Sequence, residues 1–151
     1  MNLKDLHSIY FLGIGGIGMS ALARYFQAKG IAIHGYDKTP SALTGELTNE
    51  GMIIHFDDNP SGIPDDLDLV IYTPAVPQLL LEFKFLKKSG IPMLKRAQVI
   101  GKITEGKITV AVAGTHGKSK CLGGTAVNGK ELLYPYIAEY PVRSNHFVII
   151  E

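Results

Sequence analysis

Short apolar runs alternate with segments of mixed apolar and polar residues along the first hundred positions of the chain. The apolar runs predict buried β-strands at residues 9–12, 31–37, 52–56, 67–73 and 91–94. The mixed segments predict helices at residues 19–28 and 78–89, a helix that is capped by Ser41 and runs through residue 49, and a further helix that begins at residue 95. Acids, an asparagine and two prolines predict a surface loop at residues 57–66. Such repeated alternation predicts an α/β domain with a doubly wound parallel sheet and right-handed crossovers.

The first predicted strand runs directly into a glycine-rich turn, in which Gly13, Gly15 and Gly18 follow the G-x-G-x-x-G spacing. Glycine permits a positive φ in a tight turn and lets the backbone approach a pyrophosphate closely. The free N–H groups of the following helix then point at the anion. A turn that binds nothing is the alternative, but the position between a strand and a helix is the one that the motif requires.

An acidic residue, Asp37, ends the second predicted strand, 19 residues beyond Gly18. In dinucleotide-binding folds an acid at about this spacing meets a ribose hydroxyl. A strand-end acid that belongs to a local turn is the alternative.

A second α/β pattern begins after residue 106. The apolar strand at 107–113 leads into Gly114-Thr115-His116-Gly117-Lys118-Ser119. Gly-Lys-Ser after a strand is typical of the end of a phosphate-binding loop, in which backbone N–H groups, a lysine and a Mg²⁺-binding hydroxyl meet the phosphates. Val112 stands where the full motif has its first glycine. An ordinary strand and turn with a surface lysine therefore stays open.

The residues after Ser119 do not continue this second pattern. Gly123 and Gly124 oppose the helix that should follow a phosphate-binding loop. A strand at 146–150 ends on Glu151, whose carboxylate could ligate Mg²⁺. We expect residues to be missing between Ser119 and Lys120 and after Glu151; a degenerate second domain is the alternative.

Composition limits the partners. Fifteen basic and fourteen acidic residues give a formal charge of +1, so no global field recruits nucleic acid or an anionic membrane. The single cysteine fits a reducing compartment, and His34 and His55 lack metal-ligand spacing. With no signal peptide and no apolar run near the roughly 20 residues of a membrane span, we expect a cytoplasmic protein that binds neither nucleic acid nor membrane. The oligomeric state stays open.

Five motifs in one order resemble the Mur ligases of peptidoglycan synthesis: residues 13–20, 35–37, 73–76, 95–98 and 113–119. The resemblance is continuous from about residue 1 to 119 and resumes at 122–124 with Asn128 and at 148–151. It implies a Rossmann-like UDP-sugar-binding domain at residues 1–106 and an incomplete P-loop α/β ATPase domain at residues 107–151. The family's C-terminal domain is absent from these residues.

The resemblance also implies an activity and its residues. ATP with Mg²⁺ would phosphorylate the carboxylate of UDP-N-acetylmuramate, and the amine of L-alanine would attack the acyl phosphate. The UDP-sugar would be bound by Gly15, Gly16, Ile17, Gly18, Met19, Asp37, Thr73, Pro74, Ala75 and Val76. ATP would be bound by Gly114, Thr115, His116, Gly117, Lys118 and Ser119, with Lys118 as the catalytic residue that stabilises the transferring phosphoryl group. Ser119 and Glu151 would ligate Mg²⁺.

Three other functions stay open. A relative that recycles murein tripeptide onto the same UDP-sugar shares the motifs. An NAD(P)-dependent oxidoreductase would use the glycine turn and Asp37, although no catalytic base is evident. A non-catalytic nucleotide-binding module would need only the two loops. In each ligase hypothesis we expect this chain alone to be inactive.

Overall fold

The computed structural model describes residue 3 and residues 5–105. The chain divides into two compact units, Met1–Val99 and Ile100–Glu151, and the site described below belongs to the first. The predictions for residues 107–151 lie outside the described residues, and the domain boundary at 106/107 stays a prediction.

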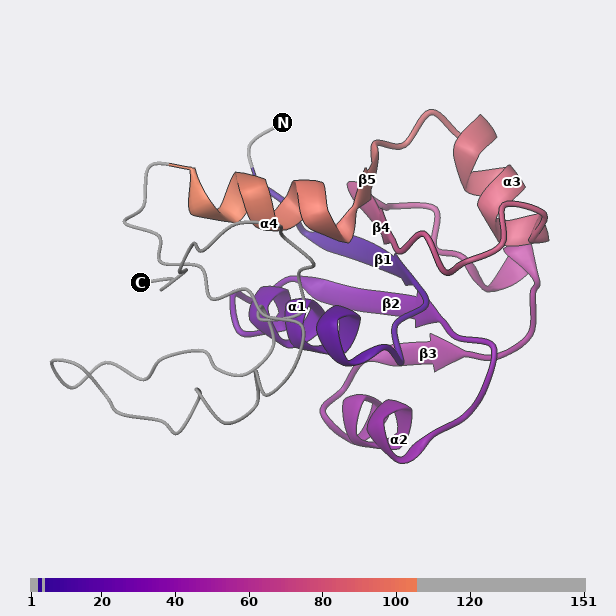
Figure 1. Cartoon of the computed structure of the whole chain (residues 1–151), viewed down its shortest axis with the longest axis horizontal. Coiled ribbons are helices and arrows are strands. Elements are labelled where there is room, and N and C mark those ends of the chain that lie inside the picture. The colour runs from indigo at the N-terminus through magenta and orange to yellow at the C-terminus, as the bar shows by residue number, and fades with distance from the viewer. Residues whose placement is uncertain (1–2, 4, 106–151) are drawn as a thin grey trace, which may run out of the picture. The chain divides into compact units, whose positions relative to one another are not determined.

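The described elements follow the predicted alternation (Figure 1). In chain order they are β1 (Ser8–Leu12), α1 (Ile17–Gln27), β2 (Ala32–Tyr36), α2 (Ala42–Asn49), β3 (Ile53–His55), the 3₁₀ turn η1 (Pro60–Gly62), β4 (Leu69–Tyr72), α3 (Leu81–Lys88), β5 (Met93–Lys95) and α4 (Arg96–Thr104). Within these residues, none of the helices is long and apolar enough to cross a membrane.

The five strands form one parallel sheet in the order β3-β2-β1-β4-β5. The chain moves outward from β1 in one direction and, after β3, returns to the other side of β1. This confirms the predicted doubly wound α/β fold. The switch in direction lies between β1 and β4, which is where ligands bind in open α/β sheets.

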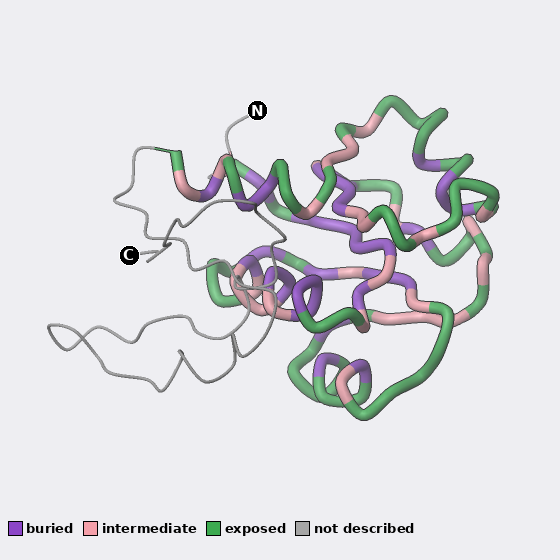
Figure 2. The backbone as a smooth tube through the Cα atoms, viewed as in Figure 1, coloured by how far each residue is buried: buried purple, intermediate pink, exposed green. Residues whose placement is uncertain are grey.

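Both faces of the sheet are covered. All five residues of β1 are buried (Figure 2), and successive side chains of a strand point to opposite faces. Tyr10 and Leu12 share a core cluster with Phe83 and Leu86 of α3. Figure 1 shows α1 in front of the strands, and the face of α1 that carries Leu22, Ala23 and Phe26 is buried.

Two helices begin two or more residues away from their predicted starts. Helix α1 begins at Ile17, two residues earlier, because the glycine turn ends directly in the helix. Helix α3 begins at Leu81, three residues later, because Leu80 N–H bonds to the carbonyl of Pro77 and closes a turn there. The predicted loop at 57–66 contains the 3₁₀ turn η1.

Candidate nucleotide-binding site

Five residues lie side by side at the carboxyl edge of the sheet. The strand register aligns Leu12 with Tyr36 and Tyr72, and these in turn with His55 and Lys95. The chain leaves the sheet immediately after each of them. The glycine turn, Asp37 and the loop that starts at Thr73 therefore meet at one edge, as the sequence predicts for a shared site.

Gly13 is the residue that bends the chain out of β1. Its φ of 84° lies in the left-handed region, which favours glycine because it has no Cβ. The N–H groups of Gly13 and Ile14 donate to the carbonyl of Tyr36 at 2.8 and 3.1 Å. A Cβ on Gly13 would lie 3.0 Å from a methyl of Val76 and 3.1 Å from the methyl of Thr73, so the turn and the β4 loop are in close contact.

The four N–H groups from Gly15 to Gly18 differ in whether they have an acceptor within the described residues. Gly15 N–H donates to Asp37 and Gly16 N–H to the Gly13 carbonyl. Across the described residues, the hydrogen bonds leave the N–H groups of Ile17 and Gly18 without a protein acceptor. These are the first two positions of α1, where the helix dipole favours an anion.

Asp37 lies against the glycine turn. Its Oδ2 accepts the N–H of Gly15 at 2.8 Å and its Oδ1 accepts the N–H of Thr39 at 3.2 Å. A Cβ on Gly15 would come within 2.8 Å of that Oδ2 and 2.9 Å of the Thr44 methyl. A side chain at position 15 would therefore press against Asp37 and Thr44, while the close approach of this glycine to a phosphate stays a prediction.

Gly18 has a different neighbour, Arg96, the first residue of α4. A Cβ on Gly18 would overlap the Nη1 atom of the Arg96 guanidinium and lie 2.7 Å from its Cζ. A cation therefore lies directly beside Gly18, one of the two residues whose N–H groups have no acceptor among the described residues. The sequence offered the motif at 95–98 as a resemblance but gave Arg96 no role.

The other residues that are expected to bind the UDP-sugar differ in their solvent exposure. Ile17 is 56% exposed at the start of α1, and Pro74 and Ala75 are exposed in the β4 loop. Met19 is 3% exposed, and its N–H donates to the carbonyl of Gly16. Met19 can therefore support the turn by packing, while the roles of all these residues toward a ligand stay predictions.

The residues expected for ATP and Mg²⁺, from Gly114 to Ser119 and Glu151, lie outside the described residues. Within the part of the chain that the structure describes, no group of three or more His, Cys, Asp or Glu side chains could hold a metal ion.

Sequence reasoning missed a buried polar cluster under α3. The carboxylate of Glu82 is 0% exposed and lies 2.5 Å from the Tyr10 hydroxyl and 2.7 Å from Nε2 of His55. These residues are 72 and 27 positions from Glu82, so only the topology of the sheet brings them together. The one signal in the sequence is an acid on the face of α3 that also carries Phe83 and Leu86.

A five-stranded parallel sheet with a glycine turn at its switch point defines the class: a Rossmann-like α/β domain with a candidate anion site at the start of α1. The family model described as "Mur ligase family, catalytic domain" matches residues 8–108. The chain belongs to this family.

Known proteins support the same membership. The chain is 53% identical over 123 residues to a protein named UDP-N-acetylmuramate--L-alanine ligase from Flavobacterium psychrophilum, in a match that covers 79% of this chain and 28% of the relative. The crystal structure of a UDP-N-acetylmuramate-alanine ligase from Thermotoga maritima superposes with a TM-score of 0.68 at 32% identity, over 74% of this chain and 26% of that one.

A murein peptide ligase from Psychrobacter arcticus superposes with a TM-score of 0.66 at 25% identity, over 76% of this chain and 24% of that chain. In all three matches, the chain spans between about a quarter and 28% of the length of the relative.

Proposed function

We propose that this chain is the UDP-sugar-binding part of an ATP-dependent ligase that joins L-alanine to the carboxylate of UDP-N-acetylmuramate through an acyl phosphate. The ligase would act in peptidoglycan synthesis in the cytoplasm. Residues 1–106 would form the UDP-sugar domain, and residues 107–151 would belong to the ATP-binding domain.

The observation that carries this proposal is the local geometry of the glycine turn. Two N–H groups, of Ile17 and Gly18, and the guanidinium of Arg96 lie together at the carboxyl edge of the sheet. Three donors of this kind fit the negative oxygens of a diphosphate. The 53%-identical relative carries the name of a ligase whose substrate contains a UDP group, and this supports a UDP-sugar as the diphosphate.

The loop after β4 would hold the nucleoside. Thr73 and Val76 pack against Gly13, while Pro74 and Ala75 are exposed beside it. A nucleoside attached to a diphosphate at the start of α1 would reach this loop. Asp37, tied to Gly15, would set the shape of the turn and lie near the ribose.

Residues 114–119 would supply the chemistry. Lys118 would stabilise the charge of the phosphoryl group as it moves from ATP to the muramic acid carboxylate. Ser119 and Glu151 would hold Mg²⁺, which neutralises phosphate charge when bound.

Isothermal titration calorimetry with UDP-N-acetylmuramate and, separately, with NADH tests the proposal. We expect the UDP-sugar to bind and NADH not to bind. Binding of NADH without binding of the UDP-sugar would overturn the ligase assignment and favour an oxidoreductase, which is the class that the glycine turn and Asp37 also fit.

A ligase that transfers a murein peptide onto the same UDP-sugar is the second candidate, favoured by the structural match to a murein peptide ligase. The UDP-sugar site would be shared, so only the acceptor separates the two. A polypeptide of the relatives' length that contains these residues should release phosphate from ATP with UDP-N-acetylmuramate and L-alanine. Equal release when muramic acid without its UDP group replaces the UDP-sugar would contradict both candidates.

A further inference from the structure

A buried carboxylate joins three elements beneath the candidate site. Glu82, in the first turn of α3, is 0% exposed. Its Oε2 accepts the hydroxyl of Tyr10 from β1 at 2.5 Å, and its Oε1 accepts the N–H of Asn59 at 3.1 Å and lies 2.7 Å from Nε2 of His55, the last residue of β3. Burying a charge is costly unless it is paired and hydrogen-bonded, and here His55 is the group within ion-pair distance.

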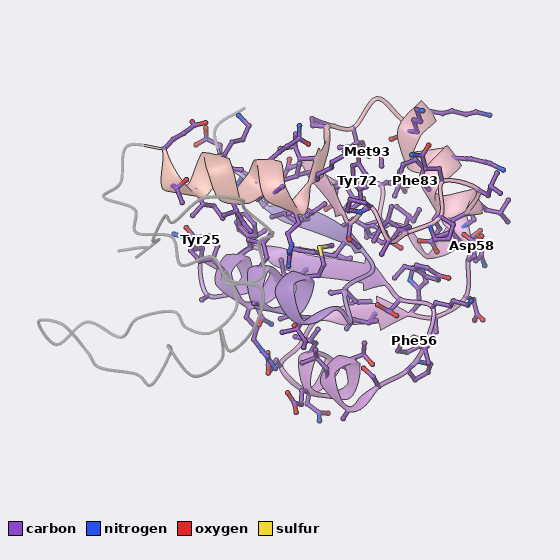
Figure 3. All side chains as sticks on the ribbon, in the orientation of Figure 1. Tyr25, Phe56, Asp58, Tyr72, Phe83 and Met93 are labelled. Carbon is purple, nitrogen blue, oxygen red and sulfur yellow. The ribbon has the colours of Figure 1, made fainter. Side chains whose placement is uncertain are left out.

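Hydrogen bonds run in both directions between the segment after β3 and the start of α3. The carboxylate of Asp58 accepts the N–H of Leu81 at 2.9 Å and that of Glu82 at 3.0 Å, and so caps α3. Figure 3 shows Asp58 beside the start of α3. Because Glu82 binds Asn59 while Asp58 binds Glu82, the first turn of α3 cannot move independently of this segment.

This first turn also anchors one end of the β4 loop. Leu80 is the N-cap of α3, and both Val76 and Leu80 pack against the core cluster that contains Tyr10 and Phe83. At the other end of the loop, the methyls of Thr73 and Val76 lie against Gly13. The loop that would hold the nucleoside therefore runs from the glycine turn to Glu82.

We propose that Glu82 and His55 are positioning residues for nucleotide binding, which fix the loop at 73–80 against the glycine turn, and that the charge on the His55 ring tunes the affinity for the UDP-sugar. This inference rests on the proposed function. Neither side chain would touch the ligand; each acts through the loop.

The His55 ring is the imidazole of this cluster, and its Nε2 lies 2.7 Å from the Glu82 carboxylate. The other titratable groups that face it are Tyr10 from β1, Tyr36 from β2, and Asp57 and Asp58 from the segment after β3. Burial, followed by the neighbouring carboxylates, raises the pKa of both Tyr10 and Tyr36, so both hydroxyls stay neutral. Carboxylates ordinarily lose their protons well below pH 6, whereas an imidazole changes charge between pH 5 and 8. A positive charge on this ring would pair with the Glu82 carboxylate, and its loss would weaken that contact.

The test is calorimetric titration of the 151-residue chain with UDP-N-acetylmuramate from pH 6 to pH 8. The diphosphate diester and the carboxylate of this ligand keep their charge over that range, so a change in Kd reports on the protein. For wild type we expect Kd to rise about 5-fold between pH 6 and pH 8, the size of a coupling near the low end of those found between linked sites. His55→Gln keeps an N–H donor for Glu82 but cannot titrate, and should bind with a Kd that does not change with pH.

Two further variants complete the design. Glu82→Gln removes the buried charge at constant volume and should weaken binding by about 5-fold at pH 6, with the far-ultraviolet circular dichroism unchanged. His34→Gln, on β2, is the matched control, because His34 is half-buried in the same sheet but has no part in the cluster; it should keep the wild-type pH profile. A folded His55→Gln variant with the wild-type profile, or a folded Glu82→Gln variant with wild-type affinity, would overturn the inference.

A second measurement does not need the ligand. In ¹⁵N-edited NMR spectra of the free chain, the amide signals of Gly13 and Val76 should shift with pH together with the His55 ring signals, and should stop doing so in His55→Gln. If wild type fails to bind the UDP-sugar but these amides still follow the ring, the proposed function is wrong and the positioning role stands. If the amide signals of Gly13 and Val76 do not shift together with the His55 ring signals, the positioning role is wrong.

Discussion

At the scale of single residues, the glycines of the turn differ in what a side chain would displace. At Gly18 a Cβ would push aside the guanidinium of Arg96, which is the mobile end of a long side chain. We therefore predict that Gly18→Ala changes the free energy of unfolding little, because alanine favours the helix. It should raise the Kd for the UDP-sugar about tenfold, since a displaced charge-assisted hydrogen bond contributes about 1.5 kcal/mol or more.

Gly45→Ala is the matched control for this prediction. Gly45 lies inside α2 and has no atom within 4 Å of its would-be Cβ. The change should stabilise the protein by about 0.5–1 kcal/mol and leave Kd unchanged. Equal Kd values for Gly18→Ala and wild type would contradict a role for Arg96 at the diphosphate.

Gly15 carries a separate prediction, because its neighbours are fixed. A Cβ there would meet Asp37 and Thr44, both held by hydrogen bonds to the backbone. Gly15→Ala should destabilise the chain by about 1–3 kcal/mol, the usual cost of overpacking, and should also weaken UDP-sugar binding. Urea unfolding followed by circular dichroism measures the first effect. A stability equal to that of wild type would show that Asp37 moves away without cost.

At the scale of elements, Asp68 joins the starts of β1 and β4. Its Oδ2 accepts the N–H groups of His7 and Ser8 at 2.6 and 3.0 Å, and these two bonds lower the pKa of Asp68 below its usual 3.8. A depressed pKa means that the folded state prefers the ionised form. The stabilisation is therefore complete above about pH 4 and is lost as the pH falls through the folded-state pKa.

We predict that Asp68→Ala lowers the free energy of unfolding at pH 7 by about 1 kcal/mol or less, because Asp68 is partly exposed and solvent screens its charge. The difference from wild type should shrink below pH 4. Asp65→Ala, which removes an exposed carboxylate nearby, is the control and should have little effect at either pH. Urea titrations at pH 7 and pH 3 measure the free energy of unfolding of both variants. A difference between Asp68→Ala and wild type that is larger at pH 3 than at pH 7 would contradict this account.

Elements are also the scale at which the sequence is most informative. Strands β1 and β4 are nearly continuous apolar runs, as expected for strands buried on both faces of a sheet, so the sequence pattern predicts their positions. The alternation of such runs with helical segments predicts the parallel topology. The glycine turn was predictable because it falls between a strand and a helix. The start of α3 was not, because Asp58, 23 residues earlier, caps it. The contact between Gly18 and Arg96 could not be predicted from the sequence either, because it depends on the crossovers that bring Arg96 back to the start of α1.

At the scale of the whole molecule, the candidate site is an edge shared by several strands, and its parts are far apart in the sequence. Gly13, Asp37 and Val76 follow three different strands, yet hydrogen bonds and methyl contacts join them. A ligand that bridges the turn and the β4 loop should therefore stabilise the fold as a unit. At 100 times its Kd, the UDP-sugar should add about 2.7 kcal/mol to the free energy of unfolding.

The proposed function assigns binding of the UDP-sugar and the ligation chemistry to different parts of the polypeptide. The UDP-sugar domain would bind the sugar nucleotide, whereas phosphoryl transfer and attack by the amine would need groups beyond it. We predict that a polypeptide of these 151 residues binds UDP-N-acetylmuramate but makes no product from ATP, L-alanine and the UDP-sugar. Chromatography of the reaction mixture detects the ligated nucleotide, with a relative of full length as the positive control. Product formed by the 151-residue chain would show that the proposed division between binding and chemistry is wrong.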